Sequence, residues 1–219
     1  MKKNEIRYLR TKTLPLLFAL LLLPALISGC ASPETYGDDE KTFPDRISPA
    51  TAQLKKEIDF LVENSNSILK TEKLILSVYP ASEFSDVVSK IRSVPRENDT
   101  VDPVYFLSLA LKLYPDCRKE DSSGTYFDAR TARRRFTEFS DSLSAQNRLI
   151  EQASDAASVF RAKFGTADNA EIILAFEEYQ QAAEEYARAV VYSGENVDQW
   201  QNRIENLKID LDNAANAIK

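Results

Sequence analysis

Apolar side chains recur every three or four residues over most of the chain beyond residue 48, which is the spacing of one face of an α-helix. Proline and glycine residues interrupt this pattern where helices are expected to begin or end. Ser48 and Pro49, for example, are a typical helix start. The sequence predicts six helices, over residues 49–79, 83–93, 103–114, 124–164, 168–192 and 197–218. No stretch alternates apolar and polar residues as a half-buried strand does, so no strands are expected.

The three C-terminal helices carry the most regular pattern, because their apolar or small residues alternate spacings of four and three. Their predicted buried residues are Ala132, Phe136, Phe139, Leu143, Ile150, Ala153, Ala157, Phe160 and Phe164, then Ile172, Phe176, Tyr179, Ala183, Tyr186 and Val190, then Val197, Trp200, Ile204, Leu207, Leu211, Ala214 and Ile218. Gln146 is the one polar residue in the first row, where it either sets the register of packed helices or lies at a wet rim. The predicted fold class is therefore all-α, an antiparallel helical bundle with coiled-coil-like long helices.

Two of the N-terminal helices, predicted over residues 49–79 and 103–114, are also strongly apolar. The predicted buried residues of the first helix are Leu54, Ile58, Leu61, Ile68, Leu69, Ile75 and Leu76. The helix over 103–114 is apolar on most sides, which is typical of a central helix or of one packed in a groove.

The first 29 residues differ from the rest in charge and hydropathy. Residues 1–12 are basic and residues 14–27 are wholly apolar, as in the leader of a secreted protein. This apolar stretch is shorter than the ~20 residues that a membrane-spanning helix needs. A cleaved signal peptide over 1–29 is therefore predicted, rather than a transmembrane anchor.

The end of this leader carries a specific motif, since residues 26–30 read Leu-Ile-Ser-Gly-Cys. The motif resembles the lipobox of bacterial lipoproteins. The resemblance implies a thioether-linked diacylglycerol on Cys30, cleavage before Cys30 and acylation of the new amine, so that Cys30 holds the protein to a lipid bilayer. Ala31 and Ser32 follow Cys30, rather than the Asp that retains enteric-type lipoproteins in the inner membrane, which favours the periplasmic side of the outer membrane. The alternative is an ordinary signal peptide with an incidental cysteine.

The lipidated N-terminus and the segment after it form the expected second region, residues 30–48. Pro, Gly, Ser and acidic residues dominate this region and no apolar period is present, which predicts a flexible tether. The alternative is an arm that packs on the domain through Tyr36 and Phe43. The helical domain is expected over 49–219.

The net charge of −6 hides an asymmetry between leader and domain. Residues 1–29 hold five basic residues and one acidic residue, which leaves 23 basic and 33 acidic residues, a net charge of about −10, in the remaining chain. Binding to nucleic acid requires a positive surface that replaces counterions. No nucleic-acid partner is therefore expected.

The chain has no histidine and only two cysteines. Without imidazole, Ser-His-Asp and Cys-His nucleophiles and His-ligated zinc sites are excluded. The most concentrated carboxylates are expected on an exposed helix face rather than in a cleft: Glu177, Glu178, Glu184 and Glu185. The protein is predicted not to be an enzyme, and no catalytic, cofactor-binding or metal-binding residue is expected.

Cys117 is the second cysteine and has no partner in its own chain once Cys30 is acylated. Its flanking residues, Pro115-Asp116 and Arg118-Lys119, predict a polar loop and hence some exposure. In an oxidising compartment such a thiol could pair with another protein or a second copy. The alternative is an inert or half-buried free thiol.

Arg130, Arg133 and Arg134 lie on one helical stripe and form a candidate partner-binding patch for phosphate or carboxylate groups. The alternative is a solvated helix face on which these arginines pair with acidic neighbours at helical spacing: Asp128, Glu138 and Asp141.

The aromatic residues of the last two helices allow two interpretations. They either line an apolar pocket between helices or form core with a polar tip: Phe176, Tyr179, Tyr186, Tyr192 and Trp200. The sequence thus favours a membrane-anchored envelope lipoprotein that acts as a scaffold, adaptor or assembly factor for envelope protein partners. The alternative function is small-molecule or lipid binding in an aromatic-lined pocket.

Overall fold

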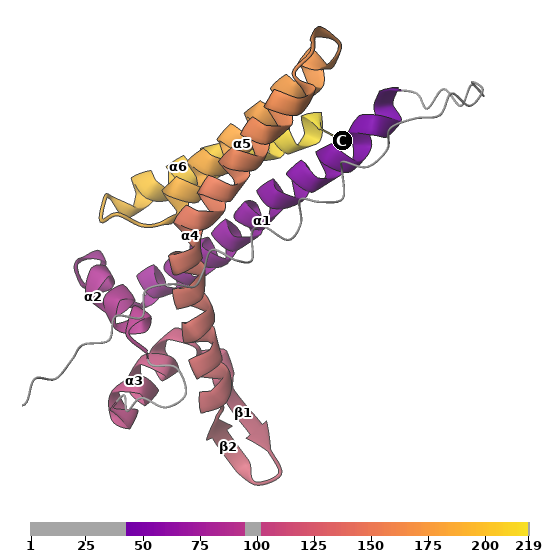
Figure 1. Cartoon of the computed structure of the whole chain (residues 1–219). Helices are drawn as coiled ribbons and strands as arrows, with labels where there is room; N and C mark the ends of the chain where they lie inside the picture. Colours follow the sequence, from indigo (N-terminus) through magenta and orange to yellow (C-terminus); the bar gives the residue numbers. More distant parts are fainter. Residues whose placement is uncertain (1–42, 95–101, 219) are drawn as a thin grey trace, which may run out of the picture. The chain divides into compact units, whose positions relative to one another are not determined.

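The computed structural model describes residues 43–94 and 102–218, so the predictions for the signal peptide, for Cys30 and for residues 31–42 lie outside the described residues. The described α-helices are α1 (Phe43–Val78), α2 (Ala81–Arg92), α3 (Pro103–Leu113), α4 (Ala129–Phe164), α5 (Ala170–Val190) and α6 (Val197–Ala217). The remaining elements are the 3₁₀ turns η1 (Pro115–Cys117) and η2 (Ala167–Asn169) and the strands β1 (Arg118–Asp121) and β2 (Gly124–Phe127). The predicted helical class is confirmed for the described part of the chain (Figure 1).

The first helix begins earlier than predicted. α1 starts at Phe43, six residues before the expected start at 49, and Pro49 lies inside it. A proline inside a helix removes the bond from its own nitrogen, and its ring crowds the carbonyl four residues earlier, so helical backbone continues on its N-terminal side only at a local cost. The last six residues of the predicted tether therefore have helical backbone.

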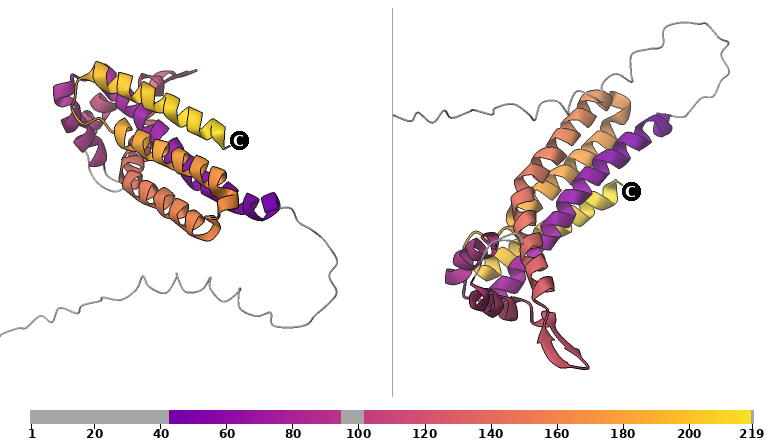
Figure 2. Two further views of the ribbon diagram at one scale, coloured as in Figure 1. Left: turned by 90° about the horizontal axis from the view of Figure 1, so that it is seen from above. Right: turned by 60° about the horizontal axis from the view of Figure 1, so that its bottom comes forward.

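The four long helices pack on one another in a defined register. α1 packs against α4 and α5, and α5 also packs against α6. The chain reverses direction between α4 and α5 and again between α5 and α6 (Figures 1 and 2). α1 and α5 run in the same direction, since Tyr179 OH donates to Asp59 and Tyr186 OH donates to Asn66, each over 2.7 Å. These two bonds are seven residues apart on both helices, which holds α1 in one register against α5.

Most buried positions of the long helices follow the predicted rows. Some predicted residues are only partly buried: Leu69, Leu76, Leu143, Ala157, Phe164, Val197, Leu207, Ala214 and Ile218. Ile172 was expected in the core but is 42% exposed, whereas Ile173 is 8% exposed and packs into it. The rest of the predicted α5 row, from Phe176 onward, is buried, so only its first position is corrected. The turn η2 precedes α5, and its buried Asn169 side chain donates to Phe164 O over 2.8 Å.

α3 is exposed on one side, although it is the most apolar helix of the chain. Its packed side faces α1 and α4 and holds Phe106, Leu109, Ala110 and Leu113. Its opposite side, here called the α3 face, consists of Val104, Leu107 and Leu111, which are 77%, 41% and 45% exposed. The prediction of a central or groove-bound helix is wrong, because α1 and α4 cover only one side of α3.

A two-stranded hairpin replaces the predicted start of the fourth long helix. β1 pairs antiparallel with β2, with Arg118 opposite Phe127 and Asp121 opposite Gly124. Gly124 takes a positive φ of 120°, and the Ser123 N–H donates to Asp121 Oδ1 over 2.7 Å at the turn. The expectation of no strands is therefore wrong. The strands are too short and too polar to show an alternating apolar pattern, and their stability comes from paired backbone groups.

Candidate functional site

The most unusual side chain of the described chain is Glu72 of α1, a carboxyl group that is only 1% exposed. Its Oε2 accepts a hydrogen bond from the Tyr192 N–H over 2.6 Å. Tyr192 follows the C-terminus of α5, so this bond joins α1 to the turn between α5 and α6.

Burial raises the pKa of Glu72 to about 8, although the Tyr192 hydrogen bond and the Arg92 charge act in the opposite direction. A carboxyl group in this state is mostly protonated at neutral pH. Glu72 also lies near the C-terminal end of α5, where the aligned peptide dipoles disfavour negative charge. The site therefore favours either a neutral carboxyl or a carboxylate with a cation beside it.

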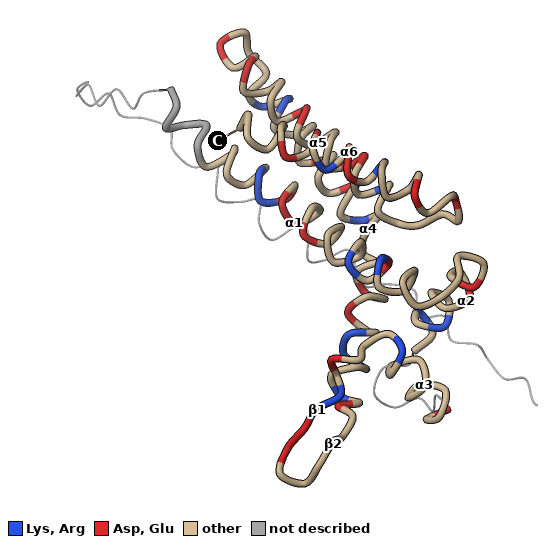
Figure 3. The backbone as a smooth tube through the Cα atoms, turned by 180° about the vertical axis from the view of Figure 1, so that it is seen from behind, with Lys and Arg blue, Asp and Glu red and all other residues tan. Residues whose placement is uncertain are grey.

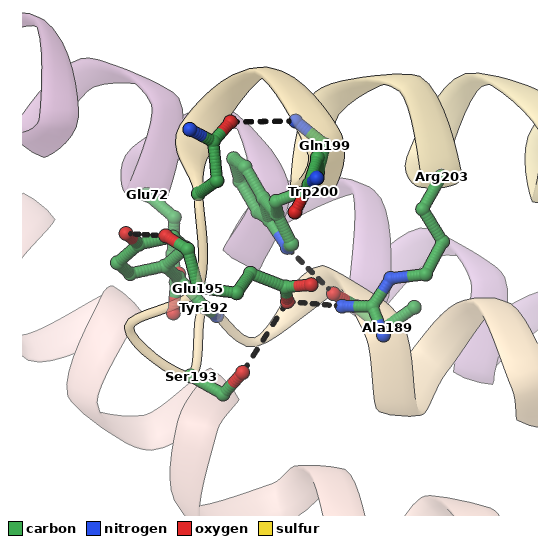
Figure 4. A network of polar contacts seen from close by, with 9 residues as sticks. Glu72, Ala189, Tyr192, Ser193, Glu195, Gln199, Trp200 and Arg203 are labelled. Carbon is green, nitrogen blue, oxygen red and sulfur yellow. Dashed lines mark hydrogen bonds and ion pairs between the residues drawn. The ribbon is translucent and has the colours of Figure 1, made fainter.

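The turn that holds the Tyr192 N–H is fixed by its own side chains (Figure 4). Trp200 is fully buried and its Nε1 donates to Ala189 O over 2.8 Å, while Tyr192 OH donates to Glu195 O over 2.5 Å. Arg203 forms an ion pair with the Glu195 carboxylate. The Tyr192 and Trp200 rings pack edge to face with centroids 5.3 Å apart. These contacts position the Tyr192 backbone beside Glu72.

A cleft of about 350 Å³ opens beside this turn. The lining residues that carry polar or aromatic groups are Glu72, Phe84, Ser85, Ser89, Arg92, Tyr192 and Ser193. Arg92 lies close enough to Glu72 to lower its pKa, yet the two side chains form no ion pair among the described residues. The Phe84 and Tyr192 rings pack edge to face at 4.9 Å and form an aromatic wall. The cleft thus presents a carboxyl group, a guanidinium group, serine hydroxyl groups and an apolar surface.

A larger cleft of about 490 Å³ lies where the end of α6 meets α1 and α5. Ile172, Phe176 and Lys55 are among its lining residues. The Lys55 ammonium already pairs with Asp59 over 2.8 Å. This cleft therefore offers fewer uncommitted polar groups than the one at Glu72.

The aromatic residues of the last two helices were expected either to line a pocket or to form core with a polar tip, and both cases occur. Tyr179 and Tyr186 are buried in the core with their hydroxyl groups bonded to Asp59 and Asn66. Burial raises the pKa of Tyr186 to about 12. Only Tyr192 of these residues lines the Glu72 cleft.

Gln146 of α4 is buried rather than placed at a rim. Its Nε2 donates to Ser65 Oγ over 2.9 Å and to Ala187 O over 3.0 Å, and its Oε1 accepts from Asn64. One side chain therefore bonds to α1 and to α5 at the same level. This agrees with the interpretation that it sets the helix register.

The predicted arginine stripe lies at the start of α4, beside the hairpin and α3 (Figure 3). The Arg133 guanidinium stacks 5.1 Å from the Phe106 ring centroid, and Arg134 pairs with Glu138 over 3.5 Å. The Arg130 side chain is exposed. Two of the three arginines thus have neighbours of their own, and the stripe borders α3 rather than the Glu72 cleft.

Of the acidic residues expected to pair with this stripe, Glu138 does pair with Arg134, whereas Asp128 has another role. Asp128 caps α4, since it accepts from the Thr131 N–H over 3.0 Å and from the Thr131 hydroxyl over 2.7 Å. These bonds lower the pKa of Asp128. Asp116 forms a two-pronged contact of 3.0 and 2.6 Å with Arg135, the arginine next to the predicted stripe.

Cys117 is a free thiol, but the predicted partial exposure is wrong, because its side chain is fully buried. The turn η1 directs the side chain inward: the Cys117 N–H donates to Tyr114 O over 3.0 Å, and its carbonyl accepts from the Asp128 N–H over 2.8 Å. Burial also raises the pKa of the thiol, which lowers the fraction of reactive thiolate.

Glu72 was not identified from the sequence, although a signal for it exists. The buried positions of α1 are spaced by alternating fours and threes, and this row passes through two polar residues, Ser65 and Glu72. A charged residue in a predicted core row could therefore have been singled out. Its opposite charge, Arg92, lies on another helix and could not.

Within 43–94 and 102–218, no helix has the length and apolar character needed to cross a membrane. The same residues hold no group of three or more acidic or cysteine side chains that could hold a metal ion. No family model, curated protein or solved structure matches the chain.

Proposed function

We propose that the protein is a membrane-anchored, non-enzymatic lipoprotein of the cell envelope that acts as a scaffold, adaptor or assembly factor for other envelope proteins. The lipobox resemblance of residues 26–30 supports an anchor on Cys30 and a position on the periplasmic side of the outer membrane. The observation that carries the adaptor role is the α3 face, a continuous row of exposed Val104, Leu107 and Leu111. Contiguous apolar side chains left in water are typical of interaction surfaces.

We propose that α1, α4, α5 and α6 form a helical bundle with coiled-coil-like packing, in which α4, α5 and α6 are antiparallel neighbours and α1 runs parallel to α5. Two observations support it: the buried rows with spacings of four and three, and the bonds from Tyr179 and Tyr186 to α1 that are seven residues apart. Helices packed in this way form a stiff unit, which suits a protein that holds partners at fixed positions.

The length of α1 separates the anchoring side from the partner-binding side. Its 36 residues correspond to about 54 Å at 1.5 Å per residue. The proposed tether joins α1 at Phe43, whereas α3 packs near the other end, where Lys112 Nζ lies 5.6 Å from the Tyr79 ring centroid. The α3 face would then be presented far from the point at which the tether enters the domain.

The arginine stripe supports a partner of definite chemistry. Arg133 borders α3 through its stacking on Phe106, and Arg130 is exposed on the same stripe. We expect the partner to be an envelope protein with an apolar surface bordered by carboxylates. Binding would cover the α3 face and place these carboxylates next to the arginines.

Photocrosslinking in intact cells tests the adaptor role. A photoreactive amino acid at Leu107 should crosslink to a specific envelope protein, whereas the same group at Val159, an isolated exposed residue of α4, should not. Reversal of Arg130 and Arg133 to Glu should reduce the Leu107 crosslink. Equal crosslinking at both positions, or none at Leu107, would contradict the adaptor role.

Fractionation of the Cys30→Ser variant tests the anchor separately. We expect loss of lipid labelling and release of the protein from membranes. Retention of the unlipidated variant in the membrane fraction would contradict anchoring through Cys30.

A further inference from the structure

We propose that the cleft at Glu72 binds a small zwitterion of the free amino-acid class, with its ammonium group on Glu72 and its carboxylate on Arg92. This inference goes beyond the adaptor role and does not depend on it. It stands on four features of the cleft: a carboxyl group and a guanidinium group that line it together, a row of donors on α2, the α5 terminus and the cleft's size.

The first feature is that a carboxyl group and a guanidinium group line the same cleft. Glu72 approaches from α1 and Arg92 from the last turn of α2. A ligand with an ammonium at one end and a carboxylate at the other would bridge them.

The ammonium end of the cleft is set by Glu72 and by α5. The Glu72 carboxyl group is almost fully buried, and one of its oxygens is held by the Tyr192 N–H. The nearby C-terminal end of α5 favours positive charge through its aligned carbonyl groups. Burial without a counter-charge explains the raised pKa of Glu72. A bound ammonium would supply that charge, and Glu72 would then release its proton.

The carboxylate end is set by α2. Ser85, Ser89 and Arg92 follow one another at spacings of four and three and all line the cleft, so they form one stripe of hydrogen-bond donors. A guanidinium group with neighbouring hydroxyls is a typical receptor for a carboxylate. The Phe84 and Tyr192 rings provide an apolar wall for the carbon chain between the two charged groups.

Size and charge together disfavour other ligand classes. A volume of about 350 Å³ is at the lower end of the range for small-molecule sites. A simple anion would meet the Glu72 carboxyl, and a metal ion would meet Arg92 with only one carboxylate ligand. A zwitterion satisfies both residues at once.

Calorimetric titration of the full lipidated chain in detergent tests this inference. The probes are glycine, L-alanine, L-leucine, β-alanine and γ-aminobutyrate, which vary side chain and charge separation. Propylamine and propanoate each supply only one of the two charges. We expect at least one amino acid to bind, and the two single-charge probes to bind at least tenfold more weakly.

Matched variants assign the two ends. Glu72→Gln and Arg92→Gln should each weaken binding at least tenfold, whereas the controls Glu63→Gln on α1 and Lys90→Gln on α2 should leave it unchanged. Titrations at pH 7 in buffers of different ionisation enthalpy should show proton release on binding. The Glu72→Gln variant should lose this release.

Three results would overturn the inference. They are the absence of binding by every amino acid to protein with native circular dichroism, binding that survives both cleft variants, and equal binding of propylamine or propanoate. Each of these results leaves the adaptor role untouched, because crosslinking at Leu107 is measured separately.

Discussion

The buried interface between α1 and α5 contains polar side chains, whereas the solvent-facing side of α3 is apolar. The α1–α5 interface buries Glu72 and bonds Asp59 and Asn66 to tyrosine hydroxyls. The α3 face exposes Leu107 and Leu111 to solvent. Every fully buried side-chain polar atom of the described residues has a hydrogen-bond partner, which offsets part of the cost of burying polar groups. Polarity by itself therefore does not locate the interior of this protein.

The largest expected effect concerns the pH dependence of Glu72. Its pKa is about 8 in the folded chain and near the ordinary 4.5 in the unfolded chain, so the folded chain binds more protons between these values. The free energy of unfolding should therefore fall as pH rises from about 4.5 to 8, by at most about 5 kcal/mol. Urea unfolding of the wild type and of Glu72→Gln over pH 4–9 measures it. Gln cannot titrate, so the fall should be much smaller in the variant, and identical profiles would contradict the prediction.

The packed side of α3 is expected to matter nearly as much. Leu113 is fully buried, and Leu113→Ala should lower the free energy of unfolding by about 2–5 kcal/mol through lost burial and the cavity left behind. Chemical denaturation followed by circular dichroism measures this loss. A loss below about 1 kcal/mol would mean that α3 is only loosely attached to α1 and α4.

A smaller effect is expected at the buried polar contact of α4. Gln146→Ala leaves Ser65, Ala187 O and Asn64 without this partner and should lower the free energy of unfolding by about 1–3 kcal/mol. The neighbouring exposed Asn147→Ala provides the matched control and should change little. Equal stability of the two variants would show that Gln146 is not needed to join the helices.

The smallest effect is expected on the α3 face. Leu111→Ala should change the free energy of unfolding by no more than about 0.5 kcal/mol, because Leu111 is exposed and alanine is a good helix former. The same variant should reduce the crosslink of Leu107 to its partner. A loss of stability as large as that of Leu113→Ala would show that the α3 face is covered in the folded protein.

Much of the helical structure follows from local pattern. The predicted rows of α4 and α6 are buried or partly buried. Asp102, Asp128 and Asn196 cap α3, α4 and α6 with side-chain hydrogen bonds. These features depend on residues within a few positions of one another, which is why spacing predicts them. The hairpin escaped prediction because four-residue polar strands are stabilised by backbone pairing rather than by an apolar face.

The candidate site was the least predictable part. Tyr192 was considered as a pocket residue from the sequence and does line the cleft, but Glu72 and Arg92 were not. Arg130, Arg133 and Arg134 were predicted as one stripe and lie together at the start of α4. Cys117 was assigned to a polar loop from its neighbours, yet the η1 turn buries it.

By itself, the sequence determines the position of most helices, the acidic charge of the chain after residue 29 and the lipobox resemblance at Cys30. These properties are local, because they depend on residue type and on short spacings. Tertiary structure alone decides that α3 exposes its leucines, that Glu72 is buried beside Tyr192 and that Arg92 shares its cleft. The physical reason is that burial, and with it the pKa of a carboxyl group, depends on neighbours contributed by helices that are distant in the chain.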